Sequence, residues 1–421
     1  METVPHLTTA LTGPLLEIEA LFLERQPRIE AWFREQWLHT PAPFYASVDL
    51  RNAGFKLAPV DTNLFPAGFN NLNPAFFPLC IQAVQIAMER VYPMARRVLL
   101  IPESHTRNLP YLESLAILRD ILRKAGFEVG IGALSPVPSP IALPSGKVLE
   151  FLPLQRKGGK LVAGGFEPCV VLLNNDLAEG CPPLLKGLEQ PVVPPLEGGW
   201  WHRLKSAHFH HYQKVAEAFA ELVGIDPWLI APMFRNCGAI DFMKREGEAC
   251  LARYVGELLE AIREKYRRYG VDRRPFVIIK ADAGTYGMGI MSVSDPREVE
   301  GLNRRQRTKM AFAKGGRHVQ RVILQEGVYT FEDWDGAVAE PVVYLIDHYV
   351  VGGFYRVHTG RSPDENLNAP GMHFQPLAFA SSCLEPSPDM SPDAQPNRFY
   401  AYGVIARLAL LAAAREQTHG G

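Results

Sequence analysis

Apolar residues along this chain recur at two kinds of spacing, which together predict a mixture of helices and strands. Apolar positions three and four residues apart predict helices over roughly 11–38, 81–92, 111–125, 206–223, 247–269 and 398–416. Short apolar runs predict strands over 97–101, 127–134 and 169–173, and strands dominate from 276 to about 379. Hairpins are predicted within 149–162 and within 44–72, where a loop rich in proline, glycine and asparagine follows.

The order of these elements divides the chain into four parts of an α/β (α+β) protein. Strands and helices alternate over 96–200, which predicts a small Rossmann-like α/β domain with parallel strands. A helix and a hairpin precede it in 1–95, and a helical part follows in 201–275. The last part, 276–421, is predicted to be a sheet that ends in an alanine- and leucine-rich helix.

Composition narrows the classes of partner. The formal net charge of −1 argues against nucleic acid or an anionic membrane surface. No apolar run approaches the length of a membrane span, and the N-terminus lacks the features of a secretory signal. The six cysteines are scattered singly, which predicts reduced thiols in a cytoplasmic protein. His208, His210 and His211 lack a further ligand at zinc-like spacing, so they are expected on the surface or in packing.

The segment Phe276-Val-Ile-Ile-Lys280-Ala-Asp-Ala-Gly284-Thr-Tyr-Gly287-Met-Gly289 has the pattern of a strand that ends in a glycine-rich loop, and a second apolar run follows it. Glycines let backbone N–H groups approach a polyphosphate, and Lys280 supplies a charge for it. The loop is neither a Walker A motif nor a Rossmann fingerprint, because no helix follows it. A mobile hairpin without a ligand is the alternative.

Two acidic residues and an amide near the N-terminus are candidate metal ligands. Asp61 and Asn63 are two residues apart on a predicted strand and share one face, and Asp49 on the partner strand can lie opposite. Carboxylate and amide oxygens suit Mg²⁺. The alternative is a turn capped by Asp and Asn side chains.

The loop Phe65-Pro-Ala-Gly-Phe-Asn70-Asn71 is rich in amides. Amide and guanidinium groups can bind the carboxylate and amine of an amino-acid substrate. The candidates are Arg51, Asn70, Asn71 and Arg107, and for each the alternative is an ordinary hydrogen-bonded loop residue.

Three later segments, taken with the glycine loop, resemble the ATP-grasp superfamily and, within it, bacterial glutathione synthetase. They are Val322-Ile-Leu-Gln325-Glu326-Gly327, the pair of runs from Glu340 to Asp347 and from Val350 to Arg356, and Asn366-Leu-Asn368-Ala-Pro-Gly371. The resemblance implies that Lys280 contacts the ATP phosphates and that Arg356 stabilises the transferring phosphoryl group. It further implies a lid at Gly284, Tyr286, Gly287 and Gly289, adenine beside Gln325 and Glu326, ribose or adenine at Glu340, and Asn366 beside the phosphoryl group.

One cation and the metal ligands depart from the family pattern. Arg203-Leu-Lys205-Ser-Ala-His-Phe209 resembles the helix start that carries the first phosphate lysine, and either Arg203, at the matching position, or Lys205 could replace it. The magnesium ligands should follow Asn366, but the matching pattern instead lies at Asp49, Asp61 and Asn63. This arrangement implies a circularly permuted ATP-grasp fold, with Asp364 and Glu365 as reserve ligands.

The phrase Lys56-Leu-Ala-Pro-Val-Asp61-Thr-Asn63-Leu-Phe-Pro66, with the amide loop, resembles the proteobacterial glutamate–cysteine ligase family over most of the chain. That family implies an enzyme that uses ATP and Mg²⁺ to join the γ-carboxylate of L-glutamate to the amine of L-cysteine through an acyl phosphate. The alternatives are glutathione synthetase or another amino-acid ligase, and a non-catalytic nucleotide- or peptide-binding protein. The sequence leaves open whether the protein forms a homo-oligomer.

Overall fold

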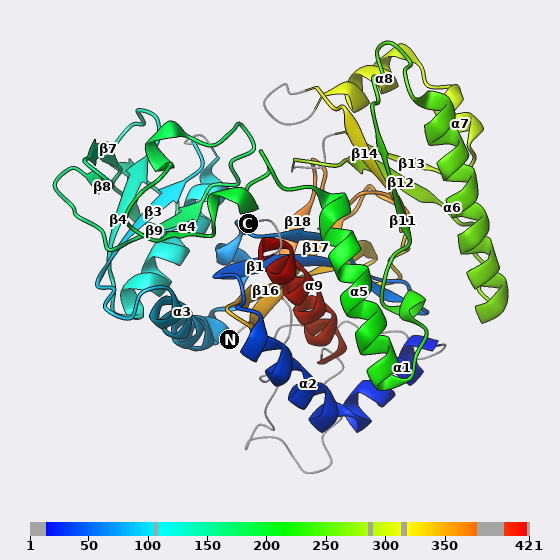
Figure 1. Cartoon of the computed structure of the whole chain (residues 1–421), viewed down its shortest axis with the longest axis horizontal. Coiled ribbons are helices and arrows are strands. Elements are labelled where there is room, and N and C mark those ends of the chain that lie inside the picture. Colours follow the sequence, from blue (N-terminus) through cyan, green and yellow to red (C-terminus); the bar gives the residue numbers. More distant parts are fainter. Residues whose placement is uncertain (1–13, 105–107, 285–288, 313–317, 377–399, 419–421) are drawn as a thin grey trace.

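A computed structural model describes residues 14–104, 108–284, 289–312, 318–376 and 400–418. The described chain has a mixed α/β fold with several sheets, in which a small α/β domain and a second lobe flank a central sheet (Figure 1). The predicted fold class is therefore confirmed. No helix in these ranges is both long enough and apolar enough to cross a membrane.

The central sheet is assembled from the two ends of the chain. Its strands lie in the order β18-β17-β16-β1-β2, with β15 also paired to β16. The strand bounds are β1 Tyr45–Asn52, β2 Leu57–Asn63, β15 Asp333–Trp334, β16 Ala337–Ile346, β17 Tyr349–His358 and β18 His373–Pro376. β1 runs antiparallel to β16, with Asp49 opposite Val342. The first hairpin thus completes the sheet of the last part, as the predicted permutation requires.

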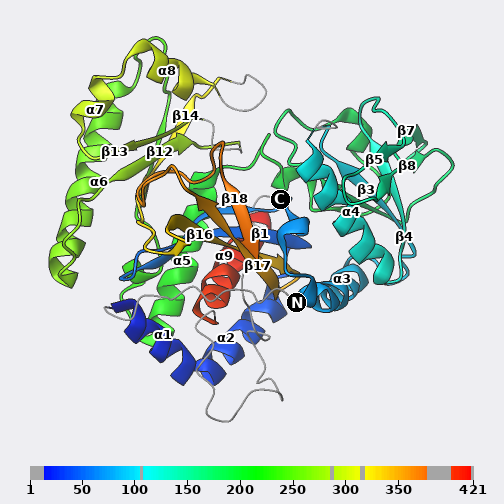
Figure 2. The ribbon, with the colours of Figure 1, turned by 180° about the vertical axis from the view of Figure 1, so that it is seen from behind.

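Helix α9, Tyr400–Thr418, packs across one face of the central sheet (Figure 2). It is buried from Tyr400 to Ala414, because α5, Lys205–Val223, and α1, Pro14–Glu24, also pack on it. Alternation along β1 places Ala46, Val48 and Leu50 in this core and leaves the intervening residues on the opposite face. The predicted N-terminal helix is divided into α1 and α2, Gln26–His39, because α2 starts anew with a proline in its first turn.

The small domain is built on a sheet in the order β10-β9-β3-β4-β7-β8. Four of its pairings are parallel, which confirms the predicted parallel strands. β8 returns antiparallel to β7 at Gly158-Gly159, within the hairpin predicted over 149–162. The bounds are β3 Arg97–Pro102, β4 Glu128–Ala133, β5 Ile141–Ala142, β6 Val148–Leu149, β7 Leu152–Lys157, β8 Lys160–Ala163, β9 Val170–Asn174, β10 Val192–Val193, α3 Phe77–Val91 and α4 Leu109–Lys124.

The second lobe carries a four-stranded antiparallel sheet in the order β11-β14-β12-β13. The strand, glycine loop and strand predicted around Lys280 are β12, Val277–Ala281, and β13, Ile290–Val293, paired with each other. The other elements are β11 Phe234–Gly238, β14 Arg321–Glu326, α6 Glu248–Tyr269, and two short helices that the sequence pattern did not predict, α7 Arg297–Glu300 and α8 Arg304–Ala311.

Short 3-10 helices lie in the connections: η1 Phe69–Asn71, η2 Pro74–Phe76, η3 Pro183–Leu185, η4 Leu196–Gly198 and η5 Pro227–Leu229. Five cysteines in the described ranges are free thiols, and Cys383 lies outside those ranges. His208 is buried, in agreement with a role in packing.

Glu332 makes stability depend on pH. Its buried carboxylate contacts the Tyr402 hydroxyl and lies 3.5 Å from Asn52 Nδ2. Burial raises the pKa of Glu332 from 4.5 to about 8. At neutral pH the folded state therefore keeps a proton that the unfolded chain has lost, so stability present below pH 4.5 is lost as the pH rises through about 8.

We expect Glu332→Gln to remove this loss, because the amide keeps the shape without titrating. Urea unfolding at several pH values measures the free energy of unfolding of both proteins. The difference between the two free energies should shift in favour of the variant as the pH rises to about 8. A difference that stays constant with pH would contradict the assignment.

Candidate active site

A cavity of about 550 Å³ lies where the central sheet, the four-stranded sheet and the small domain meet. The face of the central sheet opposite α9 supplies alternate residues, including Ser47, Asp49 and Arg51 of β1. Ile278 and Lys280 of β12 and Gln325 of β14 line it from the second lobe. The small domain contributes Glu103, Asn108, Tyr111, Asn174 and Asp176. Residues of three predicted parts, 1–95, 96–200 and 276–421, therefore line one cavity. Lys205, from the part 201–275, lines it too.

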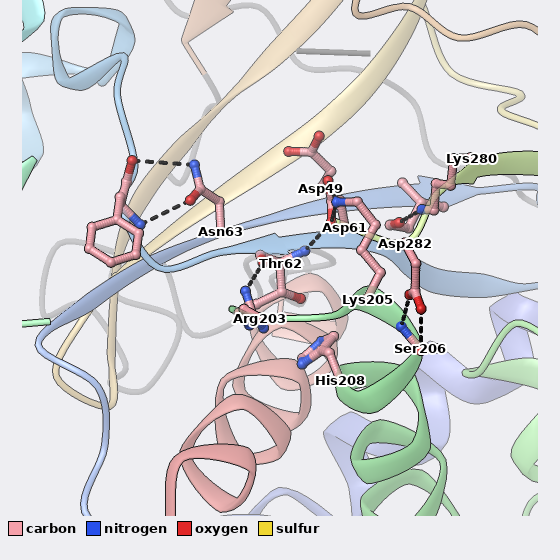
Figure 3. Close-up of polar contacts among 12 residues, drawn as sticks. Asp49, Asp61, Thr62, Asn63, Arg203, Lys205, Ser206, His208, Lys280 and Asp282 are labelled. Carbon is pink, nitrogen blue, oxygen red and sulfur yellow. Dashed lines mark hydrogen bonds and ion pairs between the residues drawn. The ribbon is translucent and has the colours of Figure 1, made fainter. Parts of the chain in front are cut away.

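Two lysines flank the carboxylate of Asp61 (Figure 3). Lys205 Nζ lies 2.8 Å from both carboxylate oxygens, and Lys280 Nζ donates to the Val60 carbonyl at 2.6 Å. Burial alone would raise the pKa of Asp61, but Lys205 and Lys280 outweigh it and hold that pKa well below its usual range. Burial lowers the pKa of Lys280 to about 8, an effect that Asp61 opposes and Lys205 adds to.

Asp49 lies directly opposite Asp61 on the neighbouring strand, as predicted. It accepts a hydrogen bond from Arg356 Nη1 at 3.0 Å. Burial raises the pKa of Asp49 and the Glu340 and Asp61 carboxylates add to this, while Arg356 opposes it. This mutual repulsion is what a cation held between Asp49 and Asp61 would relieve.

The donor set around this pair fits a hard cation only in part. The Asn63 amide bonds within its own loop, accepting from Phe65 N at 2.9 Å and donating to Phe65 O at 3.3 Å. That is the capped turn considered as the alternative to a metal ligand. Among the described residues, no group of three or more His, Cys, Asp or Glu side chains is placed to hold a metal. Two facing carboxylates would leave the remaining positions of Mg²⁺ to water and phosphate oxygens, as that ion prefers.

Arg356 and Arg51 lie on either side of the Glu340 carboxylate. Arg356 Nη1 is 2.5 Å from Oε1, and Arg51 Nε is 2.8 Å from Oε2. Arg51 also donates to the carbonyls of Val328 and Pro363 at 3.2 Å and of Glu365 at 2.5 Å. Its guanidinium is therefore already bound by the protein, but Arg51 also lines the cavity, so its contact with substrate stays a prediction. Arg356 Nε, in contrast, is buried without a hydrogen-bond partner among the described residues.

The predicted adenine contacts differ in what their side chains do. Gln325 lines the cavity, and its Nε2 is buried without a hydrogen-bond partner in the described ranges. Glu326 also lines the cavity, but its carboxylate pairs with Lys56 at 2.8 Å and accepts from Trp228 Nε1 and Met233 N. The Glu326 side chain thus fixes β14 to the tip of the first hairpin, and its backbone N–H also donates to the Met233 carbonyl at 2.7 Å.

The structure distinguishes the two candidates for the first phosphate cation. Lys205 lines the cavity, whereas Arg203 is not among the described residues that do. Arg203 lies beneath β2 (Figure 3), where it donates to the Thr62 carbonyl at 2.6 Å and pairs with Glu416 of α9 at 3.1 Å. The geometry therefore favours Lys205 over Arg203, the residue at the matching motif position.

The amide loop lies at the small-domain end of the cavity, where Asn70 and Asn71 line the wall. Ser114 of α4 accepts from Gly68 N at 2.7 Å, and Asn174 Nδ2 donates to the Pro66 carbonyl at 2.8 Å. The small domain thereby holds the loop in place. Asn366 also lines the cavity, but its amide bonds to the backbone of Asn368.

The remaining predicted residues are the lid glycines, the reserve metal ligands and Arg107. Gly284 lines the cavity, and Gly284 and Gly289 adopt φ of +108° and +63°, values that favour glycine. Of the reserve ligands, Glu365 lines the cavity and Asp364 does not. Tyr286, Gly287 and Arg107 lie outside the described residues.

Sequence reasoning missed Lys56 and Asp282, which bind residues of the site without being predicted to contact a ligand. Lys56 appeared only as part of a motif, and its pairing with Glu326 spans 270 positions. Asp282 binds the start of α5. The only signal for it was the unusual helix start, which places Leu204 where a capping side chain normally stands.

Paired carboxylates and two lysines therefore share one cavity between two antiparallel sheets of an α/β protein. The chain belongs to the glutamate–cysteine ligase family, whose model matches residues 19–417. It is thus a ligase.

A crystal structure from Methylobacillus flagellatus KT, provisionally assigned as a gamma-glutamylcysteine synthetase, is 60% identical, with a TM-score of 0.90 and 99% of each chain covered. D-alanyl-alanine synthetase A from Vibrio cholerae is 9% identical, with a TM-score of 0.34 and coverage of 74% of this chain and 80% of that one. A glutathione synthetase-like effector from Globodera pallida is 10% identical, with a TM-score of 0.36 and coverage of 80% and 75%. No curated protein matches the chain.

Proposed function

We propose that this enzyme uses ATP to join the γ-carboxylate of L-glutamate to the amine of L-cysteine, the first step of glutathione biosynthesis. Family membership supports this reaction. The observation that carries the site assignment is the placement of Asp49, Asp61, Lys205 and Lys280 on one cavity between two sheets. Such a site suits a polyphosphate with its metal, because it offers both cations and oxygen ligands.

In the proposed reaction the γ-carboxylate of glutamate attacks the terminal phosphorus of ATP, and ADP leaves. The cysteine amine then attacks the acyl phosphate carbonyl, and phosphate leaves with formation of the amide. Phosphoryl transfer of this kind depends mainly on positioning and charge neutralisation. The protein therefore needs cations around the transferring group rather than a nucleophile of its own.

The scheme assigns tasks to several of the side chains that line the cavity. Lys205 and Lys280 would bind phosphate oxygens, and Arg356 would stabilise the charge on the transferring group. Asp49 and Asp61 would hold Mg²⁺, which supplies neutralisation of the phosphate charge when bound. The Gln325 amide, which has no hydrogen-bond partner for Nε2 among the described residues, would bind the adenine edge, and Asn70 and Asn71 would bind the amino-acid groups of a substrate.

An ADP-release screen across pairs of amino acids, with mass spectrometry of the product, tests the function. Glutamate with cysteine and Mg²⁺ should yield ADP and γ-glutamylcysteine in equal amounts, and EDTA should abolish both. ADP release only with γ-glutamylcysteine and glycine would instead identify a glutathione synthetase. ATP binding without substrate-dependent ADP release across the panel would identify a non-catalytic binding protein.

A further inference from the structure

Helix α5 begins without a capping side chain of its own. Its N-cap is Leu204, whose side chain has no group that can accept a hydrogen bond from the first turn. The first backbone N–H groups of a helix lack partners within the helix, and a capping Ser, Thr, Asp or Asn normally binds one of them. At α5 this turn carries Lys205, which reaches Asp61 in the cavity.

Asp282, which directly follows β12, supplies the missing cap from a distant part of the sequence (Figure 3). Its Oδ1 accepts from Ser206 N and its Oδ2 from Ser206 Oγ, both at 2.7 Å. Its backbone carbonyl accepts from Lys205 N, also at 2.7 Å. A single buried aspartate thus binds the first two N–H groups of the helix, and its carboxylate lies at the positive end of the helix dipole.

The same aspartate is two residues from Lys280, so it connects the two cations of the cavity. Both lysines line the cavity: Lys280 from β12 and Lys205 from the first turn of α5. The Lys205 side chain also packs on Trp200, with Nζ 4.1 Å from the ring centroid. Asp282, which directly follows β12, is held against the neighbouring strand β14 by its backbone N–H, which donates to the Arg321 carbonyl at 3.1 Å.

We propose that Asp282 is a positioning residue for nucleotide phosphate, because it fixes the start of α5 to β12 and so sets the separation of Lys205 and Lys280. Asp282 is not one of the residues that line the cavity in the described ranges, so it acts through the two lysines. The inference rests on the proposed role of these lysines as phosphate ligands. Its ligand class is a nucleoside triphosphate, recognised through its phosphates.

The test compares binding of a non-hydrolysable ATP analogue with binding of adenosine by calorimetry in the full-length enzyme with Mg²⁺. Asp282→Ala removes both side-chain acceptors, and its loss of the cap should weaken analogue binding roughly tenfold. Adenosine binding should not change, because it lacks phosphates. Asp282→Asn keeps an acceptor for Ser206 N, so it should restore most of the affinity. If Asp282 had only a structural role, its loss would weaken the binding of both ligands to the same extent. That result would overturn the proposal.

Asn303→Ala is the matched control, because Asn303 caps α8 by a similar bond to Gln306 N at 2.9 Å, away from the cavity wall. It should leave the ratio of the two affinities unchanged. If Asp282→Ala does not fold, Ser206→Ala becomes the deciding variant, because it removes only the bond to Oδ2. It should weaken analogue binding selectively, and unchanged binding would overturn the proposal.

The outcome can be separated from that of the proposed function. A chain that binds the analogue in this Asp282-dependent way but forms no γ-glutamylcysteine would contradict only the ligase reaction. A chain that forms γ-glutamylcysteine, and whose Asp282→Ala variant binds the analogue as tightly as the wild type, would contradict only the positioning role.

Discussion

Lys280→Ala should lower kcat by roughly 10²-fold or more, because it removes the buried cation that, in the proposed reaction, would stabilise charge developing in the transition state. The side chain is 6% exposed and lies within reach of the Asp61 carboxylate and the Lys205 amine. No solvent cation can replace it cheaply in such a position. The measurement is steady-state ADP release with glutamate and cysteine, together with KM for ATP.

The pH dependence gives a second readout for the same residue. Because burial lowers the pKa of Lys280 to about 8, the free enzyme loses this charge as the pH rises through that value. Wild-type kcat/KM for ATP should therefore fall on the alkaline side, and the variant should lack this limb.

Lys214→Ala is a suitable control, because Lys214 lies exposed on α5 and does not line the cavity. It should match the wild type in rate and in pH profile. A Lys280→Ala enzyme with near-wild-type turnover would remove Lys280 from the site.

The sequence pattern was sufficient wherever a local signal determined the structure. The glycines after Lys280 predicted the strand, loop and strand of β12 and β13, and the hairpin predicted within 44–72 placed Asp49 opposite Asp61. The permutation was predicted because the family motif lay in the wrong half of the chain. Pairing of β1 with β16 then placed that hairpin in the sheet of the last part.

The sequence could not show the surroundings of a side chain whose partner lies far along the chain. Arg203 matches the motif position, but its guanidinium binds Glu416, which is 213 positions away, and so it cannot reach the cavity. Arg51 is likewise bound by Glu340 and three carbonyls of the last part. Residue type alone predicts that an arginine or amide can bind a ligand, but only the tertiary structure shows whether the protein already uses it.

Asp61→Asn should raise the Mg²⁺ concentration for half-maximal activity by roughly tenfold or more, since even residues that merely support metal ligands contribute this much to affinity. The substitution keeps the shape of the side chain and removes its charge. Asp49 would then be the one carboxylate of the facing pair, and Mg²⁺ would rely more on phosphate oxygens and water. Magnesium titrations of ADP release at saturating substrates measure the shift.

A control with the same local chemistry separates metal binding from loss of an ion pair. Asp226 pairs with Lys265 at 2.6 Å, as Asp61 pairs with Lys205, but it does not line the cavity. Asp226→Asn should therefore leave the magnesium titration unchanged. A titration of the Asp61→Asn enzyme that coincides with the wild type would rule out the facing carboxylates as the metal site.

The same substitution also tests the electrostatic coupling within the cavity. The Asp61 charge raises the pKa of Lys280, opposing the effect of burial. Without that charge the pKa of Lys280 should fall, and the alkaline limb of kcat/KM should move to lower pH in the variant. A shifted magnesium titration with an unmoved alkaline limb would keep Asp61 as a metal ligand but assign the limb to a group other than Lys280. Movement of both would place metal, carboxylate and lysine in one coupled site, because a single charge then governs both measurements.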